Sequence, residues 1–565
     1  MRNIVICLIL STILGMFYSC AEDTINSRPV DFTPIEILLG DSVKINGFVN
    51  NIYADIPTGH NRLGSNSMVA ASIDEAVHAS VGSEAERWGT GSWGPTTLHD
   101  NSFSSSYDAI RKTFIYEELI RPNIQDFIMG PYGRDILYGQ VLFLRALYNF
   151  ELLKRFGGYP IVDRMLNAGE ELSFPRNTYD QCVEYIASLC DEASGLLPTS
   201  YAANQLGRAT KGAALALKSR LLLYAASPLF NDASNPSDGL ERGTYNISKW
   251  EDAAEAAASI INLASNGSAV YSLFNDYGTF FNTLNNNREI IFSRMEGATN
   301  TLERLNGPVS ITGGLGGTNP TLELVDSYEM INGTRFDWDN PIHAANPFLN
   351  REPRFYKSIL YNGATWMNNM TIETFSGGND LEGTNATRTG FYLRKFLSVN
   401  ARWNAPTGTA FHCFPLFRFG EVLLNYAEAM NEAYGPDTDP KGFSLTARDA
   451  IKMIRVRAGI TGNIDLSQTV PAGDKVKMRD AIRHERKIEL AFEEHRHLDL
   501  RRWKIAVEIL NSPVHGISIT KNTDGTFSYS KAVVENRVFD PKMYLYPFPQ
   551  TEISRNQNLI QNTGW

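Results

Sequence analysis

The chain contains long segments in which apolar residues recur at helical spacing, and each segment has only one apolar stripe. One such stripe consists of Leu137, Val141, Leu144, Tyr148 and Leu152. A helix with a single apolar stripe must bury that stripe against a neighbour, so successive antiparallel pairs have to stack. The chain is therefore predicted to be mainly α-helical, with a tetratricopeptide-like helical repeat scaffold.

The helical segments fall into two blocks, residues 135–265 and residues 414–565, and the second block includes a C-terminal tail. Residues 266–413 lie between them and are rich in Gly, Asn, Thr and aromatic residues. We expect loops there, with short strands at 290–292 and 391–396. Long loops inside a compact protein are usually functional, so this insert is the predicted ligand-binding region.

An apolar leader opens the chain and ends at a cysteine. Residues 4–17 are mostly apolar, and these 14 residues are fewer than the roughly 20 that a membrane-spanning helix needs. Residues 1–19 are therefore interpreted as a signal peptide. The junction resembles a bacterial lipoprotein processing site, which implies that Cys20 is lipidated, and the acidic pair after it looks like a tag for the cell surface. An ordinary signal peptide followed by a chance cysteine is the alternative.

The remaining chain, residues 20–565, is expected to form one domain whose N-terminal segment is 20–134. Hydrophobic residues make up 43% and charged residues 20% of the sequence, which is typical of a folded globular protein. The net charge is −10 and there are no basic runs, so nucleic acid is excluded as a partner because phosphate binding needs clustered Lys and Arg. Attachment to a membrane would rest on the lipid alone.

Two local patterns are interpreted as structural. Glu485, Glu489 and Glu493 share one helical face near several Arg and Lys residues, which favours a buried network between helices over ligand binding. Three cysteines remain outside the leader and Cys20, too few for a disulfide scaffold in a chain of this length. They are predicted to be buried thiols that act as small hydrophobic residues.

Several stretches in the expected order resemble the SusD/RagB family of outer-membrane nutrient-binding lipoproteins. They include the sequence RFGGYP in the first block, GRATKGAA further along it, and the ending YPFP followed by the last ten residues. The matching ranges are 144–160, 207–214, 418–429, 485–503, 546–549 and 556–565. The resemblance implies four tetratricopeptide-like helix pairs with an irregular region packed on them. It also implies a non-catalytic protein that binds an oligosaccharide, or another oligomeric nutrient such as a peptide, for a SusC-like TonB-dependent transporter.

The candidate ligand-binding residues come from two segments that the resemblance places near the ligand. Sugar rings pack their C–H faces on flat aromatic side chains, while their hydroxyl groups need polar partners. Residues 86–104 contain two tryptophans among Gly and Ser, and residues 294–319 contain polar side chains among glycines. For the tryptophans, plain packing is an equally weighted alternative. The candidates are Trp88, Trp93, Asn101, Arg294, Glu296, Asn300 and Arg304.

Patterns that could indicate an enzyme or a metal site are incomplete. His495 and His497 would point about 200° apart on a helix, and no third ligand accompanies them. The glycine-rich stretch 313–317 lacks the lysine of a phosphate loop, and Ser92 lacks the context of a nucleophile elbow. We therefore predict no catalytic residue, metal ligand or cofactor, and Ca²⁺ has no support. A glycan-degrading enzyme and a structural adaptor of a transporter complex remain the alternatives.

Overall fold

The computed structural model describes residues 38–565 except 168, 171–172, 233–244, 312 and 402–407. The leader and Cys20 lie outside these described residues, so lipidation stays a prediction. No helix in the described part of the chain is long and apolar enough to cross a membrane.

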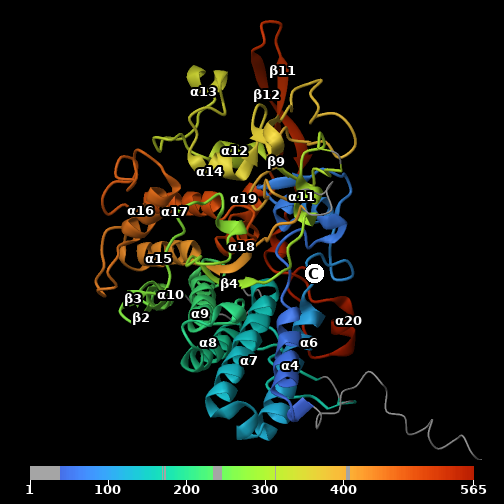
Figure 1. Ribbon diagram of the computed structural model, residues 1–565, viewed down its shortest axis with the longest axis vertical. Coiled ribbons are helices and arrows are strands. Elements are labelled where there is room, and N and C mark those ends of the chain that lie inside the picture. The colour runs from blue at the N-terminus through green and yellow to red at the C-terminus, as the bar shows by residue number, and fades with distance from the viewer. Residues whose placement is uncertain (1–37, 168, 171–172, 233–244, 312, 402–407) are drawn as a thin grey trace, which may run out of the picture.

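Eight helices form a continuous stack in which each helix packs on the next one along the chain (Figure 1). They are α6 (Phe103–Ile115), α7 (Asp126–Phe156), α8 (Tyr179–Leu196), α9 (Lys211–Ala226), α10 (Ser248–Ile261), α15 (Phe419–Tyr434), α16 (Ala447–Ala458) and α17 (Lys475–Glu489). Among the described residues they make four consecutive pairs. The predicted mainly helical, tetratricopeptide-like fold is confirmed. The stack begins with α6, ahead of residue 135.

The ends of these helices follow from local chemistry. Thr178 begins α8 with a capping box, in which its side chain accepts the Gln181 N–H and the Gln181 side chain accepts the Thr178 N–H. Helix α7 ends at Gly157, whose φ of 74° suits glycine. The buried face of α9 includes Gly212, Ala213 and Ala216, and these small residues let neighbouring helices approach closely.

The insert leaves the stack after α10 and returns to it at α15. Its two ends are held together because β4 (Ile290–Arg294) pairs antiparallel with β10 (Phe414–Arg418). Short helices and strands make up the rest of the insert. The helices are α11 (Thr301–Asn306), α12 (Leu322–Ser327), α13 (Pro341–Ala345) and α14 (Pro353–Ser358). The strands are β2 (Ala264–Ser265), β3 (Ser268–Ala269), β5 (Thr318–Pro320), β6 (Ile359–Leu360), β7 (Thr365–Trp366), β8 (Met370–Thr371) and β9 (Tyr392–Leu393).

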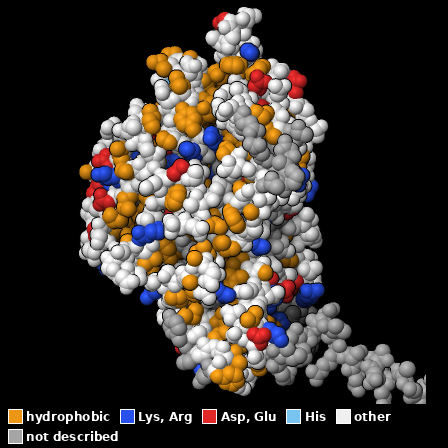
Figure 2. All heavy atoms as spheres, in the orientation of Figure 1, with side chains coloured by type: hydrophobic (Ala, Val, Ile, Leu, Met, Phe, Trp, Pro, Cys, Tyr) orange, Lys and Arg blue, Asp and Glu red, His pale blue; other side chains and the backbone are white. Residues whose placement is uncertain are grey.

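The remaining elements pack around the stack and the insert. A long hairpin of β11 (Pro513–Lys521) and β12 (Phe527–Asn536) projects from the end of the molecule opposite to the lower ends of α4 and α7 (Figure 1). The other elements are α4 (Ser42–Ala54), β1 (Ala76–His78), α5 (Glu84–Gly89), α18 (Arg496–Arg502), α19 (Ala506–Ile509) and α20 (Gln550–Arg555). On the face shown in Figure 2, acidic and basic side chains are interspersed with apolar ones.

A buried ionic cluster joins the insert to α17 and confirms the predicted buried network. The predicted shared helical face is wrong for Glu493, because α17 ends at Glu489 and Glu493 lies in the turn that follows it. Glu485, Glu489 and Glu493 are all buried and each one pairs with cations from other segments. The cluster consists of Glu289, Glu329, Glu352, Arg354, Lys395, Arg418, Arg455, Arg457, Glu485, Glu489 and Glu493. The prediction of buried thiols is also confirmed for Cys182, Cys190 and Cys413.

Candidate functional site

Four of the predicted ligand residues lie in one short segment that runs from the last residue of β4 into α11. Arg294 and Glu296 are half-buried, with Nε and Oε1 3.6 Å apart, and the Arg294 guanidinium also donates to the carbonyl of Ile56. Asn300 is the N-cap residue of α11, and the N–H of Arg304 donates to its carbonyl at 3.1 Å. These contacts join Arg294 to Glu296 and Asn300 to Arg304.

A buried carboxylate fixes that loop against the segment that leads into β10. Glu303 Oε1 lies 2.6 Å from His412 Nε2 and accepts the N–H of Ser398 at 2.8 Å. Thr299 and Ala410 exchange backbone hydrogen bonds of 2.9 and 3.0 Å. Two distant parts of the insert thus form one surface.

This arrangement exposes an aromatic ring that the sequence analysis did not select. Phe411 is 49% exposed, although it directly follows the backbone bridge, and its carbonyl accepts from Asn282 Nδ2 at 3.1 Å. Its local sequence gave no signal of this exposure, which depends on the folded arrangement of the insert. We call the surface formed by Arg294, Glu296, Asn300, Arg304 and Phe411 the loop face.

The two predicted tryptophans lie elsewhere, in an aromatic cluster. Trp88 is 4% exposed and Trp93 is 8% exposed. Their ring centroids are 6.4 Å apart, Trp93 lies 4.8 Å from Trp565, and both rings contact Tyr546. Because neighbouring rings cover them, neither offers a face to a sugar here, and the packing alternative describes both.

Asn101 also has a local structural role. Its Oδ1 accepts the N–H of Phe103 at 3.0 Å at the start of α6, and Asn101 itself is exposed. The segment that contains it is connected to the loop face only indirectly. Asn306 Nδ2 donates to Asn61 at 2.9 Å, and the next residue, Arg62, pairs with Asp100.

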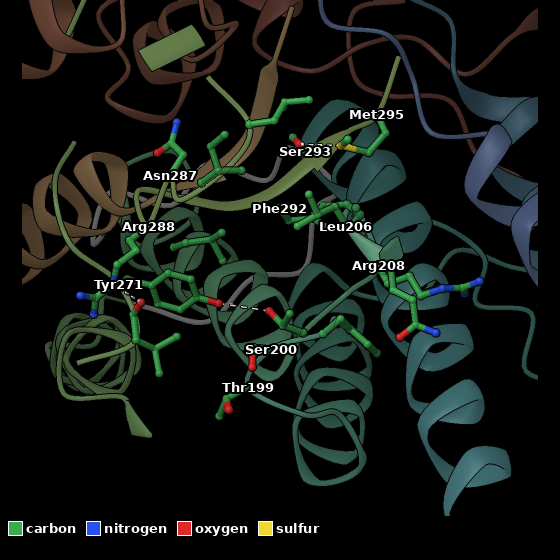
Figure 3. A pocket seen from close by; sticks show the side chains of 18 residues that line it. Thr199, Ser200, Leu206, Arg208, Tyr271, Asn287, Arg288, Phe292, Ser293 and Met295 are labelled. Atoms are coloured by element: carbon green, nitrogen blue, oxygen red, sulfur yellow. Dashed lines mark hydrogen bonds between the residues drawn. The ribbon is translucent and has the colours of Figure 1, made fainter. Parts of the chain in front are cut away.

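A pocket of about 230 Å³ lies beside the loop face (Figure 3). One wall is formed by β4 from Ile290 to Ser293, together with Met295, whereas Arg294 and Glu296 do not line the pocket. The opposite wall comes from the connection between α8 and α9, which contributes Leu206.

The polar groups around this pocket already have partners. Tyr271 Oη and Thr210 Oγ1 are 3.1 Å apart, and Arg288 Nε donates to the carbonyl of Val270 at 3.2 Å. Figure 3 shows that Arg208 points away from the pocket, and its guanidinium donates to Gln140 at 2.9 Å. The pocket can take an apolar group more readily than a polar one, because its walls include Leu206 and Met295.

The described residues contain no group of three His, Cys, Asp or Glu side chains that could hold a metal ion. His495 and His497 are buried, and desolvation lowers the pKa of each well below the ordinary value, so both are neutral. They pack inside the protein.

Comparison with known proteins places the chain in a family. Residues 282–565, which are half of the chain, match the SusD family. The chain belongs to this family. Residues 36–223 match a second SusD-like family, described as starch-binding and associating with the outer membrane. SusD-like protein P2 of Formosa agariphila is 30% identical over 145 residues, and this match spans 26% of the chain and 24% of that relative.

SusD-like structures match over nearly the whole length. A SusD-like protein from Bacteroides fragilis is 26% identical, with a TM-score of 0.77 over 94% of this chain and 98% of that one. A SusD-like carbohydrate-binding protein, also from B. fragilis, is 22% identical, with a TM-score of 0.74 over 93% and 100%. A laminarin-binding SusD-like protein is 20% identical, with a TM-score of 0.65 over 93% and 100%.

Proposed function

We propose that this SusD family protein is a cell-surface lipoprotein that binds an oligosaccharide, or another oligomeric nutrient, and delivers it to a SusC-like TonB-dependent transporter of the outer membrane. The observation that carries the proposal is the family membership, together with full-length structural similarity to proteins named for carbohydrate binding. The protein itself performs no bond breaking in this proposal, and it needs no cofactor or metal.

The loop face supplies the chemistry that a carbohydrate needs. The C–H face of a sugar ring packs on Phe411, which is exposed, while hydroxyl groups bond to the side chains of Glu296, Asn300 and Arg304. Such a site is shallow and its polar side chains are partly solvated. We therefore expect a dissociation constant in the micromolar range or weaker, which corresponds to roughly −8 kcal/mol or less in magnitude.

Isothermal titration tests this proposal with maltohexaose and laminarihexaose, chosen because relatives are named for starch and laminarin. We expect heat with at least one glycan of a wider panel, and Phe411→Ala should weaken that binding about tenfold, or ~1.4 kcal/mol. Ile342→Ala is the matched control, since Ile342 is also exposed but lies on α13. Absence of heat with every oligosaccharide and peptide would contradict the proposal.

The lipid anchor and the transporter partner need separate tests. Cys20→Ser should release the protein from the membrane fraction, because lipid is the proposed attachment. The wild-type protein should co-purify with a large β-barrel transporter from the same cells. Release of sugar products from a polysaccharide incubated with the protein would instead favour the alternative of a glycan-degrading enzyme. Co-purification with no glycan binding would favour the structural adaptor.

A further inference from the structure

A second hollow lies well apart from the loop face in the fold, between the first turns of α6 and the C-terminal helix α20. Its volume is about 230 Å³, and its remaining wall comes from the segment between α7 and α8. Figure 1 shows α6 and α20 side by side near the C-terminus. The hollow shares no lining residue with the loop face or with the pocket of Figure 3.

The floor of this hollow is aromatic and held in place. Tyr107 and Phe174 are both half-buried, so part of each ring is open to the hollow. The Tyr107 hydroxyl donates to the carbonyl of Pro160 at 2.6 Å, and its ring lies 4.9 Å from that of Phe103. Asn556 Nδ2 donates to the carbonyl of Phe174 at 2.7 Å. A ligand that stacks on the Tyr107 ring would not have to order that ring first, which avoids an entropy cost.

The rim of the hollow is polar and carries both acceptors and a donor. Asp108 is exposed on α6, and Glu552 and Arg555 lie on α20. Arg555 pairs with Glu552 at 3.3 Å, but its side chain is 68% exposed and remains available to a ligand. Two carboxylates and one guanidinium give the rim a net charge of −1, which disfavours carboxylate, sulfate and phosphate groups.

We propose that this hollow is a second carbohydrate-binding site, which takes one neutral sugar unit. The ring stacks on Tyr107 and Phe174, and its hydroxyl groups donate to Asp108 and Glu552 and accept from Arg555. The hollow is smaller than the 300–1,000 Å³, approximately, of sites for larger ligands, which is why it fits a single unit. This inference rests on the proposed function only in that the ligand is a carbohydrate.

A second site of this kind would let the protein hold a polysaccharide at two points. A polysaccharide that binds weakly at both sites at the same time is held more tightly than by either site alone, provided that it is long enough to span both sites. A short oligosaccharide occupies the two sites independently. An apolar peptide segment of a partner protein is the competing occupant of an aromatic hollow, and the experiment below distinguishes it.

Saturation-transfer NMR tests the site with methyl glucoside, methyl galactoside and methyl mannoside as probes at millimolar concentration. The protein is the chain without its leader and carries Phe411→Ala, which weakens the loop face. We expect residual transfer to at least one glycoside, and adding Asp108→Ala should raise the dissociation constant obtained by titrating that transfer about tenfold, equivalent to ~1.4 kcal/mol. Asp252→Ala on α10 is the matched control, because Asp252 is exposed as well and lies outside the hollow.

The possible results separate this inference from the proposed function. If Phe411→Ala abolishes all transfer, or if Asp108→Ala leaves the residual transfer unchanged, the second site does not exist while glycan binding at the loop face stands. A third result is that no glycoside receives transfer and that an apolar peptide, but no glycoside, protects α20 from hydrogen exchange. This result would assign the hollow to a protein partner and overturn the inference. If Asp108→Ala reduces transfer only in the presence of Phe411, the site belongs to the loop face and the inference is wrong.

Discussion

The buried ionic cluster makes a sharp prediction at Glu489, which ends α17. Its carboxylate accepts from Arg354 at 2.9 Å and from Arg418 at 2.8 Å, and it also pairs with Arg457. Burial by itself raises the pKa of Glu489, but these guanidinium groups outweigh burial and hold the pKa well below its ordinary value. Glu489 is therefore ionised, and its negative charge compensates three buried guanidinium groups.

Glu489→Gln keeps the shape of the side chain and removes its charge. Removing one partner of a buried ion pair costs about 3–5 kcal/mol, because the remaining charges stay buried without full compensation. Unfolding entropy is about 2.1 cal/mol/K per residue, so a chain of this length loses roughly 1 °C in Tm for each kcal/mol. The variant should therefore melt about 3–5 °C below the wild type in scanning calorimetry.

Glu255→Gln is the control, because Glu255 is exposed on α10 and its neutralisation should leave the Tm within about 1 °C. Glycan affinity of the folded variant should be unchanged, since Glu489 is not part of the loop face. An equal Tm for Glu489→Gln and the wild type would refute the reasoning, because it would mean that the cluster tolerates an uncompensated charge. Loss of glycan binding without loss of stability would refute the structural role.

Three further predictions concern the interior. Burial raises the pKa of Glu485, but Arg354 and Arg455 outweigh burial and lower it. Glu485 therefore stabilises the fold fully above about pH 4.3, its pKa in the unfolded chain, and this contribution to the free energy of unfolding should disappear as the pH falls further, as measured by urea titrations. Burial, and then Asp74, raise the pKa of Glu75 to about 8, so the free energy of unfolding of the wild type should fall as the pH rises from roughly 4.3 to 8. Glu75→Gln should not show this fall, and the same pH dependence in both proteins would contradict the prediction. Trp93→Ala should cost about 3–5 kcal/mol by leaving a cavity, while titration with maltohexaose stays unchanged.

The sequence predicted the helical stack well because the signal for each helix is local. The stripe from Leu137 to Leu152 lies within α7, and the capping box at Thr178 marks the start of α8. The short strand predicted at 290–292 falls within β4, and β9 falls within the predicted strand 391–396. These patterns need no knowledge of distant residues.

The candidate site was predicted less well because long-range packing decides exposure. Trp93 is covered by Trp565 and Tyr546, more than 450 residues away in the sequence, so its neighbourhood of Gly and Ser gave a misleading impression of an open loop. Phe411 is exposed and directly follows Ala410, whose bridge to Thr299 is a contact between distant parts of the sequence. The acidic face of α17 was predicted, but its partners Arg354 and Arg418 come from the insert and the β10 strand, which no local pattern connects to it.

The insert separates side chains that hold the fold from side chains on the proposed ligand-binding surface. Glu303 faces inward from α11, where it joins His412 and the backbone of Ser398, whereas Arg304 on the same helix is exposed. Replacing Arg304 or Phe411 therefore changes the surface without touching the contacts that position it. Replacing Glu303 removes those contacts and should misplace the whole loop face. A scaffold built in this way can vary its outward side chains while its buried carboxylates keep the loops in register.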